Sequence, residues 1–354
     1  LYHGALEKYA RGLKDAGLTW DSLSEADMQA RLLESFRAEL GSFSDTEIFA
    51  DAREEHFSRQ AFSNLLFNTG IMTEQIRAGS FVPAYFEQEL TGFSDPSDMT
   101  VPIGDGRTLS LTGKIDRIDI ASGAGACYVK IIDYKTGKNR LDPTKIYAGI
   151  QLQLLVYLNA AIDALGRRTD RKVLPGAVFY YHIKDSRIDE TTPLTDLQLH
   201  DLLEKDLRPS GIVLDDSAVI SALDAKLSTE SGYYSPFVSI NTKKDGSIGA
   251  SGSLLEEDSF NELRLFTRDK AASLGNSIAS GITDINPYRT KNGSACKYCV
   301  YKGVCHFDTR LRGFYYRDIA DSLSDSAADD GGRKQGASLK ALIARIVAEK
   351  EEKK

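Results

Sequence analysis

Two carboxylates and a lysine lie close together in one β-branched stretch of the chain. Residues 113–135 form two apolar arms joined by a turn of small residues, which is the pattern of a β-hairpin. Side chains alternate between the two faces of a strand, so Asp133 and Lys135 project from the same face. On the other arm, Asp116 and Asp119 are three residues apart and cannot share a face. We expect Asp116, and not Asp119, to join Asp133.

Two further polar side chains follow on a helix predicted to begin at about Ile146. Gln153 and Tyr157 are four residues apart and lie on one face of that helix. Carboxylates hold hard divalent cations, which neutralise phosphate charge and lower the pKa of bound water. A lysine beside them orients that water or stabilises developing negative charge. An Asp-x-Lys pair alone is usually a solvated surface feature, but the whole set suits hydrolysis of a phosphodiester.

The order and spacing of three short motifs carry a family resemblance. The chain reads Gly-Lys-Ile-Asp at 113–116, Asp-Tyr-Lys at 133–135 and Gln-x-x-x-Tyr at 153–157. This series resembles the RecB-like branch of the PD-(D/E)XK nucleases. The resemblance implies an α/β fold with a restriction-endonuclease-like core, in which helices flank a mixed central sheet, and helical additions outside that core.

The same resemblance implies roles for the motif residues. Asp116 and Asp133 would ligate Mg²⁺ or Mn²⁺, and Lys135 would orient or activate water. Gln153 and Tyr157 would support Lys135 or the phosphate.

A histidine lies beside the apolar stripe of the first predicted helix, residues 1–17. A single histidine near a helix start is ordinarily a surface or capping residue. In RecB-like nucleases a histidine of an early helix is a metal ligand, so the resemblance implies that His3 joins the two aspartates. It also implies that an acidic residue before the hairpin, Glu87 or Glu89, faces the site.

Three of the four cysteines are clustered near the end of the chain. Cys296, Cys299 and Cys305 have the spacing C-x2-C-x5-C. No secretory signal is visible, so metal binding is favoured over disulfides. A complete site needs four ligands. Cys127 starts the strand that carries Asp133 and reads as a small core residue, so this site is one ligand short.

The resemblance accounts for the missing ligand. RecB-like nucleases of the AddB and Cas4 kind hold a [4Fe–4S] cluster with one cysteine upstream of the core and three at its end. We therefore expect the fourth ligand upstream of this chain, which lacks an initiating Met and reads as a piece of a longer protein. The cluster would tie the two ends of the domain together, and its assembly without the upstream cysteine is an open question.

The resemblance extends over residues 3–308 and favours the AddB kind. It implies an exonuclease for single-stranded DNA within a helicase–nuclease complex that processes double-strand DNA ends for recombinational repair. The partner would be an AddA-like helicase–nuclease subunit, and ATP would be used only by a motor outside this chain. The alternatives are a free-standing Cas4-like exonuclease, a non-catalytic DNA-binding iron–sulfur scaffold, and a zinc-bound structural module.

Composition is that of an ordinary soluble protein. The 354 residues are 42% hydrophobic and 27% charged, with a formal net charge of −7. That charge does not indicate nucleic-acid binding, but residues 113–145 hold five Lys and two Arg against four Asp, enough to attract phosphate. No apolar run is long enough for a membrane span and no signal peptide is visible, so we expect a cytoplasmic location.

The elements that must position these residues divide the chain. We expect a nuclease domain at 1–310, with N-terminal helices at 1–80, a catalytic core at about 81–190, and a helical and loop insertion with the cysteine segment at 191–310. Residues 311–354 read as a partly disordered tail. It closes with a short helical stretch that we expect to fray.

Overall fold

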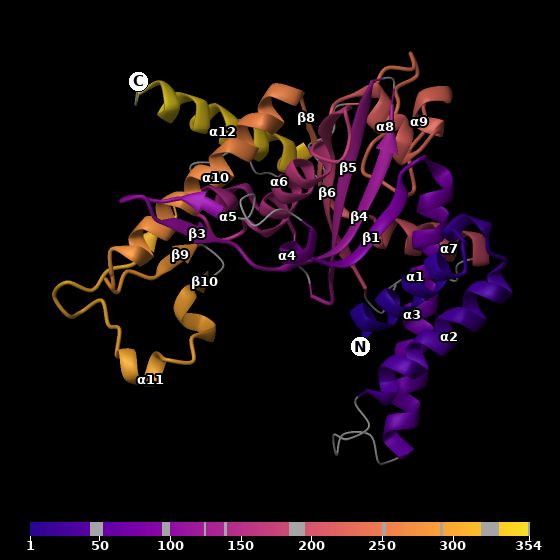
Figure 1. Cartoon of the computed structure of the whole chain (residues 1–354), viewed down its shortest axis with the longest axis horizontal. Coiled ribbons are helices and arrows are strands. Elements are labelled where there is room, and N and C mark those ends of the chain that lie inside the picture. Colours follow the sequence, from indigo (N-terminus) through magenta and orange to yellow (C-terminus); the bar gives the residue numbers. More distant parts are fainter. Residues whose placement is uncertain are drawn as a thin grey trace.

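The computed structural model of the chain is drawn in Figure 1. It describes residues 1–42, 52–93, 100–123, 125–137, 140–183, 195–249, 253–290, 293–319 and 333–352. Within these ranges a mixed β-sheet stands between two groups of helices, which confirms the predicted fold class. None of the described helices combines the length and the apolar character that a bilayer-crossing segment needs.

Six strands build the central sheet. They are β1 (Val82–Glu89), β4 (Lys114–Ser122), β5 (Ala126–Lys135), β6 (Lys172–His182), β7 (Ser210–Leu214) and β8 (Leu254–Leu255). Their spatial order is β1-β4-β5-β6-β7-β8. The pairs β1–β4, β4–β5 and β6–β7 are antiparallel, whereas β5–β6 and β7–β8 are parallel. The predicted hairpin is therefore β4–β5, and it places the two aspartate-bearing strands side by side inside the sheet.

Short strands form two smaller sheets away from this core. They are β2 (Thr100–Pro102) with β3 (Thr108–Ser110), and β9 (Tyr288–Thr290) with β10 (Gly293–Ser294) and β11 (Arg317–Asp318). The second of these sheets frames the cysteine segment.

Helices cover both sides of the central sheet (Figure 1). The first group is α1 (Tyr2–Asp15), α2 (Glu25–Gly41) and α3 (Ala52–Ala78), of which α1 contacts β1. On the other side α6 (Gln153–Gly166) packs on β5 and β6, and α10 (Glu257–Ala279) packs on α6. The remaining helices are α4 (Leu90–Phe93), α5 (Pro143–Tyr147), α7 (Asp196–Asp206), α8 (Ser217–Leu223), α9 (Lys226–Thr229), α11 (Lys302–Cys305) and α12 (Arg333–Glu351).

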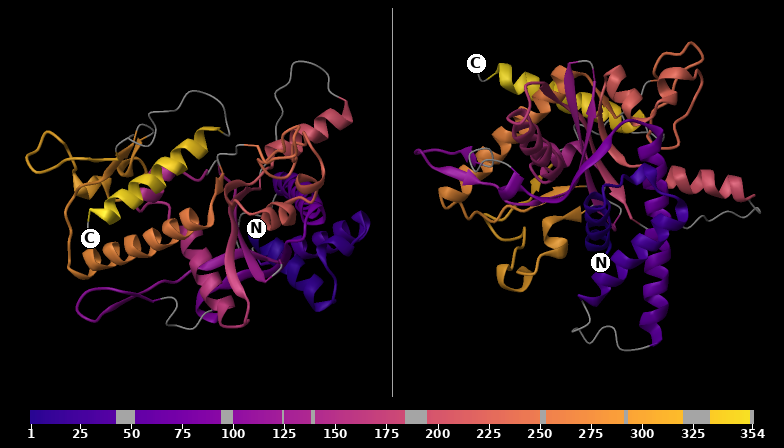
Figure 2. Two further views of the ribbon diagram at one scale, coloured as in Figure 1. Left: turned by 90° about the horizontal axis from the view of Figure 1, so that it is seen from above. Right: turned by 45° about the vertical axis from the view of Figure 1, so that its right-hand side comes forward.

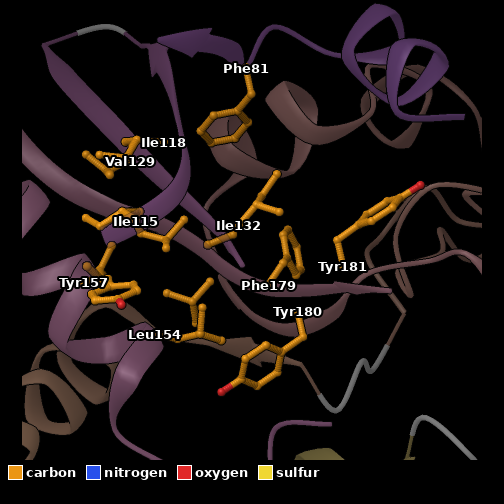
Figure 3. Packing of buried hydrophobic residues seen from close by; sticks show 14 of the residues in the cluster. Phe81, Ile115, Ile118, Val129, Ile132, Leu154, Tyr157, Phe179, Tyr180 and Tyr181 are labelled. Atoms are coloured by element: carbon orange, nitrogen blue, oxygen red, sulfur yellow. The ribbon is translucent and has the colours of Figure 1, made fainter. Parts of the chain in front are cut away.

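The core is built around β5 and α6. β5 is buried along almost its whole length, as expected for a strand covered on both faces, and its β-branched residues suit the pleat. Figure 3 shows apolar side chains of β4, β5 and β6 packed together with Leu154 and Tyr157 of α6. Full burial of one such side chain contributes about 1.5–3 kcal/mol. The core therefore fixes the positions of the strands that carry the motifs.

The single helix predicted from Ile146 is two helices in the structure. α5 ends at Tyr147 and α6 begins at Gln153. Between them Gly149 has a φ of 80°, in the left-handed region that glycine adopts without strain. The N–H groups of Ile150 and Gln151 then donate to the Lys145 carbonyl at 2.8 and 3.3 Å, which closes a compact turn. The prediction was wrong here because the pattern of apolar residues continues through the turn.

The expectation that the C-terminal helical stretch frays was also wrong. Leu339, Leu342, Ile343 and Ile346 of α12 are buried. Their spacing of three and four residues makes one apolar stripe, which packs against α10 and α5. The left-hand view of Figure 2 shows α12 running beside α10. The predicted domain boundary at residue 310 stays a prediction, but α12 is part of the same core.

A group of three charges is buried in the hairpin. Arg117 donates to both oxygens of Asp119 at 2.6 and 2.7 Å, and Lys130 lies 2.9 Å from the same carboxylate. Burial alone raises the pKa of Asp119, but Arg117 and Lys130 outweigh it and hold the pKa below its ordinary value. The Arg117 guanidinium also lies 5.5 Å from the centre of the Trp20 ring. Asp119 is therefore a structural residue that ties β4 to β5.

Replacing Asp119 with Asn is expected to lower the free energy of unfolding by about 3–5 kcal/mol at pH 7, because two buried cations lose their counter-ion. Since the folded pKa of Asp119 is depressed, its contribution is present above the unfolded pKa of about 4 and is lost as the pH falls through the lower folded pKa. Urea unfolding at pH 7 and at pH 3 measures both effects.

The matched control for this change is Asp170→Asn, because Asp170 is exposed. It is expected to change the free energy of unfolding very little at either pH. Equal effects of the two substitutions would contradict the structural role of Asp119.

Candidate metal centre and active site

His3 lies where helix α1 meets the sheet. Ala5, Leu6, Tyr9 and Leu13 bury one stripe of α1, which leaves His3 at the edge of that stripe. Its Nδ1 lies 3.4 Å from Glu87 Oε1 and 3.5 Å from Asp116 Oδ2. Hydrogen bonding first to Asp116 and then to Glu87 raises the pKa of His3 to about 10. The two carboxylates thus stabilise a positive charge at this point.

Glu87 is aimed into the site by an unusual backbone. Its φ of 44° lies in the left-handed region, which is uncommon for a residue with a side chain and marks functional sites. The carboxylate is buried, Lys114 Nζ lies 2.8 Å from its Oε2, and Oε1 has no hydrogen-bond partner among the described residues. Glu89 is exposed. Of the two acidic residues that the sequence left open, the structure places Glu87 in the site.

Asp116 and Asp133 approach each other from the two arms of the hairpin. The last pair in the β4–β5 register is Arg117 with Ile132, so the next positions outward are the two aspartates. Asp116 Oδ2 accepts a hydrogen bond from the Tyr134 N–H at 2.6 Å. Burial, and to a smaller extent the charge of Asp116, raise the pKa of Asp133 to about 6. The two carboxylates therefore share a space that is largely closed to solvent.

Lys135 lies on the same face of β5 as Asp133, as predicted from strand periodicity. Its Nζ is 2.5 Å from Asp133 Oδ2 and 5.7 Å from the centre of the Tyr180 ring. The side chain is one-quarter exposed, whereas the Asp133 side chain is almost fully buried. Lys135 can therefore reach a bound molecule from the solvent side while it stays beside the carboxylate.

Gln153 and Tyr157 form a pair next to β4. Gln153 Nε2 donates to Tyr157 Oη at 3.0 Å. A Cβ at Gly113 would lie 3.0 Å from Tyr157 Oη and 3.3 Å from Leu90, so only glycine allows the helix to pack so closely on the strand. In the described part of the chain neither residue hydrogen-bonds Lys135. The structure thus brings them to the motif glycine, and not to the lysine that the sequence led us to expect.

The donor set fits a hard divalent cation. Ligand atoms from His3, Glu87 and Asp116 all lie within 4.8 Å of one another, and Asp133 adjoins them. One imidazole nitrogen with carboxylate oxygens suits Mg²⁺ or Mn²⁺. The unpartnered Glu87 Oε1 is a further acceptor that such an ion would satisfy. A bound cation would replace the proton on His3, since metal ligands must be deprotonated.

The three clustered cysteines line one pocket at the far end of the chain. Cys296, Cys299 and Cys305 surround a cavity of about 210 Å³ together with Lys297 and Lys302. No disulfide joins them, and among the described residues their sulfurs are not gathered as tightly as the ligand atoms of the first site.

The fourth cysteine lies elsewhere. Cys127 is half-buried on β5, where its neighbours in the sheet are Ser122 and Val173. It is a sheet residue that takes no part in the cysteine pocket.

The fold and these motif strands define the class. The chain belongs to the PD-(D/E)XK nuclease superfamily, whose profile matches residues 1–306. It is similar to proteins that are named as the AddB subunit of an ATP-dependent helicase/deoxyribonuclease. The one from Clostridium kluyveri is 29% identical over 324 residues, which cover 91% of this chain and 28% of that protein.

Two further relatives with the same name are equally similar. The one from Clostridium botulinum (strain Hall) is 30% identical over 328 residues, which cover 92% of this chain and 28% of that protein. The one from Bacillus cereus (strain G9842) is 30% identical over 335 residues, which cover 93% and 28%. The chain therefore spans little more than a quarter of the length of these relatives.

Proposed function

We propose that this chain is the nuclease domain of a helicase–nuclease subunit and that it hydrolyses phosphodiester bonds of single-stranded DNA. The observation that carries the proposal is the group of His3, Glu87, Asp116 and Asp133 with Lys135 beside it. The names of the relatives support DNA as the substrate and a further subunit, an AddA-like helicase–nuclease, as the partner. ATP would then be used by a motor outside this chain.

The residues have distinct roles in this proposal. His3, Glu87, Asp116 and Asp133 hold Mg²⁺ or Mn²⁺, which supplies charge neutralisation at the phosphate and a lowered pKa for the attacking water. Lys135 donates hydrogen bonds from the solvent side, where it orients the water and stabilises the negative charge that develops on the phosphate.

Other side chains support this group. Lys114 and His3 hold the pKa of Glu87 below its ordinary value, although burial alone would raise it, so Glu87 stays ionised. The Gln153–Tyr157 pair fixes α6 against Gly113 and so keeps the first motif strand in place.

The experiment is cleavage of end-labelled single-stranded DNA in the presence of Mg²⁺. We expect cleavage that a chelator stops and that added Mg²⁺ or Mn²⁺ restores, with slower cleavage of blunt duplex DNA. Binding of DNA without cleavage would contradict the proposal and support the scaffold alternative. In the whole protein, the same activity at the ends of a duplex would have to depend on ATP if the domain works within an end-processing complex for recombinational repair.

We also propose that the cysteine pocket is part of a [4Fe–4S] site. Three thiols face one cavity, and the lysines beside it are suited to an anionic cluster. The fourth ligand would come from a cysteine upstream of residue 1. A cluster bound there would contribute its binding free energy to folding.

Replacing Cys299 with Ser, in protein extended upstream to include a fourth cysteine, is expected to remove most of the bound iron. Cys127→Ser is the matched control and should retain it, because Cys127 lies in the central sheet. Elemental analysis of iron and zinc with the visible absorption spectrum makes the measurement. Zinc in place of iron, or equal loss in both variants, would contradict the cluster.

A further inference from the structure

The C-terminal helix α12 belongs to the core although it lies beyond the 306 residues that the family profile matches. Leu339 and Leu342 are completely buried, and the helix contacts both α10 and α5. At its end Lys350 Nζ lies 2.6 Å from Glu262 Oε2 of α10. These contacts make α12 a strap across two helices of the nuclease domain (Figure 2).

Tyr147 of α5 is the point at which the three helices meet. Its ring is stacked on Phe266 of α10, with 6.0 Å between the ring centres and 4° between the planes. The Arg345 guanidinium of α12 lies 4.4 Å from the same ring, and Lys270 Nζ lies 5.5 Å from it. The Tyr147 hydroxyl donates to the Glu349 carboxylate, which also accepts from Arg345 Nε at 3.2 Å. Tyr147 is thus held by α12 and α10 together.

The segment that Tyr147 anchors leads to the active site. Gln151 Oε1 accepts from the Asp142 N–H at 2.7 Å, and Gln151 Nε2 donates to the Arg140 carbonyl at 2.9 Å. Gln151 also hydrogen-bonds Tyr180, whose ring lies 5.7 Å from Lys135 Nζ. The compact block of residues 140–152 therefore connects α12 to the side chain behind the catalytic lysine, and α6 starts directly after it.

We infer that Tyr147 is a positioning residue of the nuclease and that α12 holds it in place, an inference that rests on the proposed function. The clamp fixes the block 140–152, so that Tyr180 supports Lys135 and α6 begins at a defined point. α12 supplies no ligand atom to the group of His3, Glu87 and Asp116. Loss of the clamp displaces Lys135 and leaves cation binding intact, and a displacement of about 1 Å lowers turnover about 100-fold.

The test places the same new charge on the two faces of α12 in the full chain. Leu342→Asp sets a carboxylate in the buried stripe, and Ala344→Asp sets one on the exposed face of the same helix. For Leu342→Asp we expect faster hydrogen exchange in residues 143–147, kcat lowered about 10- to 100-fold, and KM and Mn²⁺ affinity within about twofold of the parent. Ala344→Asp should match the parent in every measurement.

A second pair of variants decides the question if Leu342→Asp fails to fold. Tyr147→Phe keeps the stacked ring and loses only the hydroxyl contact, so it should retain most of kcat. Tyr147→Ala removes the anchor and should show the exchange and kcat changes expected for Leu342→Asp. Unchanged kcat in Tyr147→Ala, or unchanged exchange in residues 143–147, would overturn the inference.

The two proposals fail in different ways. If the parent does not cleave DNA, the nuclease proposal is contradicted. Hydrogen exchange in residues 143–147 and Mn²⁺ affinity would still show whether α12 holds α5 independently of the cation site, and unchanged exchange would overturn the clamp in that case too.

Discussion

Replacing Asp116 with Asn is expected to lower Mg²⁺-dependent cleavage of single-stranded DNA about 1,000-fold, through loss of the bound cation. The amide oxygen can still accept the hydrogen bond that Tyr134 N–H donates to Asp116 at 2.6 Å, so the hairpin should keep its shape. What the change removes is a negative charge shared by His3 and the cation. Mn²⁺ binding followed by electron paramagnetic resonance, together with the cleavage rate, measures the effect.

Asp170→Asn serves as the control for Asp116→Asn as well, since Asp170 is exposed and lies outside the site. It should leave both Mn²⁺ binding and cleavage at parental values. If Asp116→Asn binds Mn²⁺ as tightly as the parent, the assignment of Asp116 as a ligand is wrong.

Replacing Lys135 with Met is expected to lower cleavage about 100- to 1,000-fold while the cation still binds. Methionine preserves the length of the side chain and its packing over Tyr180, and it removes the charge that lies 2.5 Å from Asp133 Oδ2. With that charge gone, the carboxylates attract a cation at least as strongly as before. Loss of turnover with unchanged or tighter Mn²⁺ binding would separate the role of Lys135 from that of the ligands.

Lys226→Met, on the exposed side of α9, controls for the loss of a surface lysine. It should cleave DNA at the parental rate. A Lys135→Met variant that loses Mn²⁺ binding in parallel with cleavage would show that the lysine acts on the site's structure and not on the reaction.

Strand periodicity predicted much of the site. The hairpin, the common face of Asp133 and Lys135, and the separation of Asp116 from Asp119 all follow from the twofold alternation of side chains. The fold class followed from the motif order, because the two strands and the helix can meet only in a sheet with helices against it. The structure adds a reason for the first motif glycine, on which Tyr157 packs directly.

Features that depend on backbone turns or on distant contacts could not be predicted in this way. Nothing local in the sequence indicates that Glu87 adopts a φ of 44° and turns its carboxylate toward His3. The break at Gly149 interrupts a continuous apolar pattern, so only the left-handed φ reveals it. The docking of α12 was missed for a different reason: its apolar stripe is visible in the sequence, but its partners lie about 70 and 200 residues away, on α10 and α5.

The most direct test of the central claim is a side-by-side cleavage assay of the parent and Asp133→Asn with end-labelled single-stranded DNA and Mg²⁺. Burial raises the pKa of Asp133, so its ionised form is costly to the fold, and the neutral amide should leave the free energy of unfolding unchanged or higher. The structure predicts a stable variant that cleaves at least about 1,000-fold more slowly than the parent. Equal cleavage by a folded Asp133→Asn protein would show that the reaction takes place elsewhere.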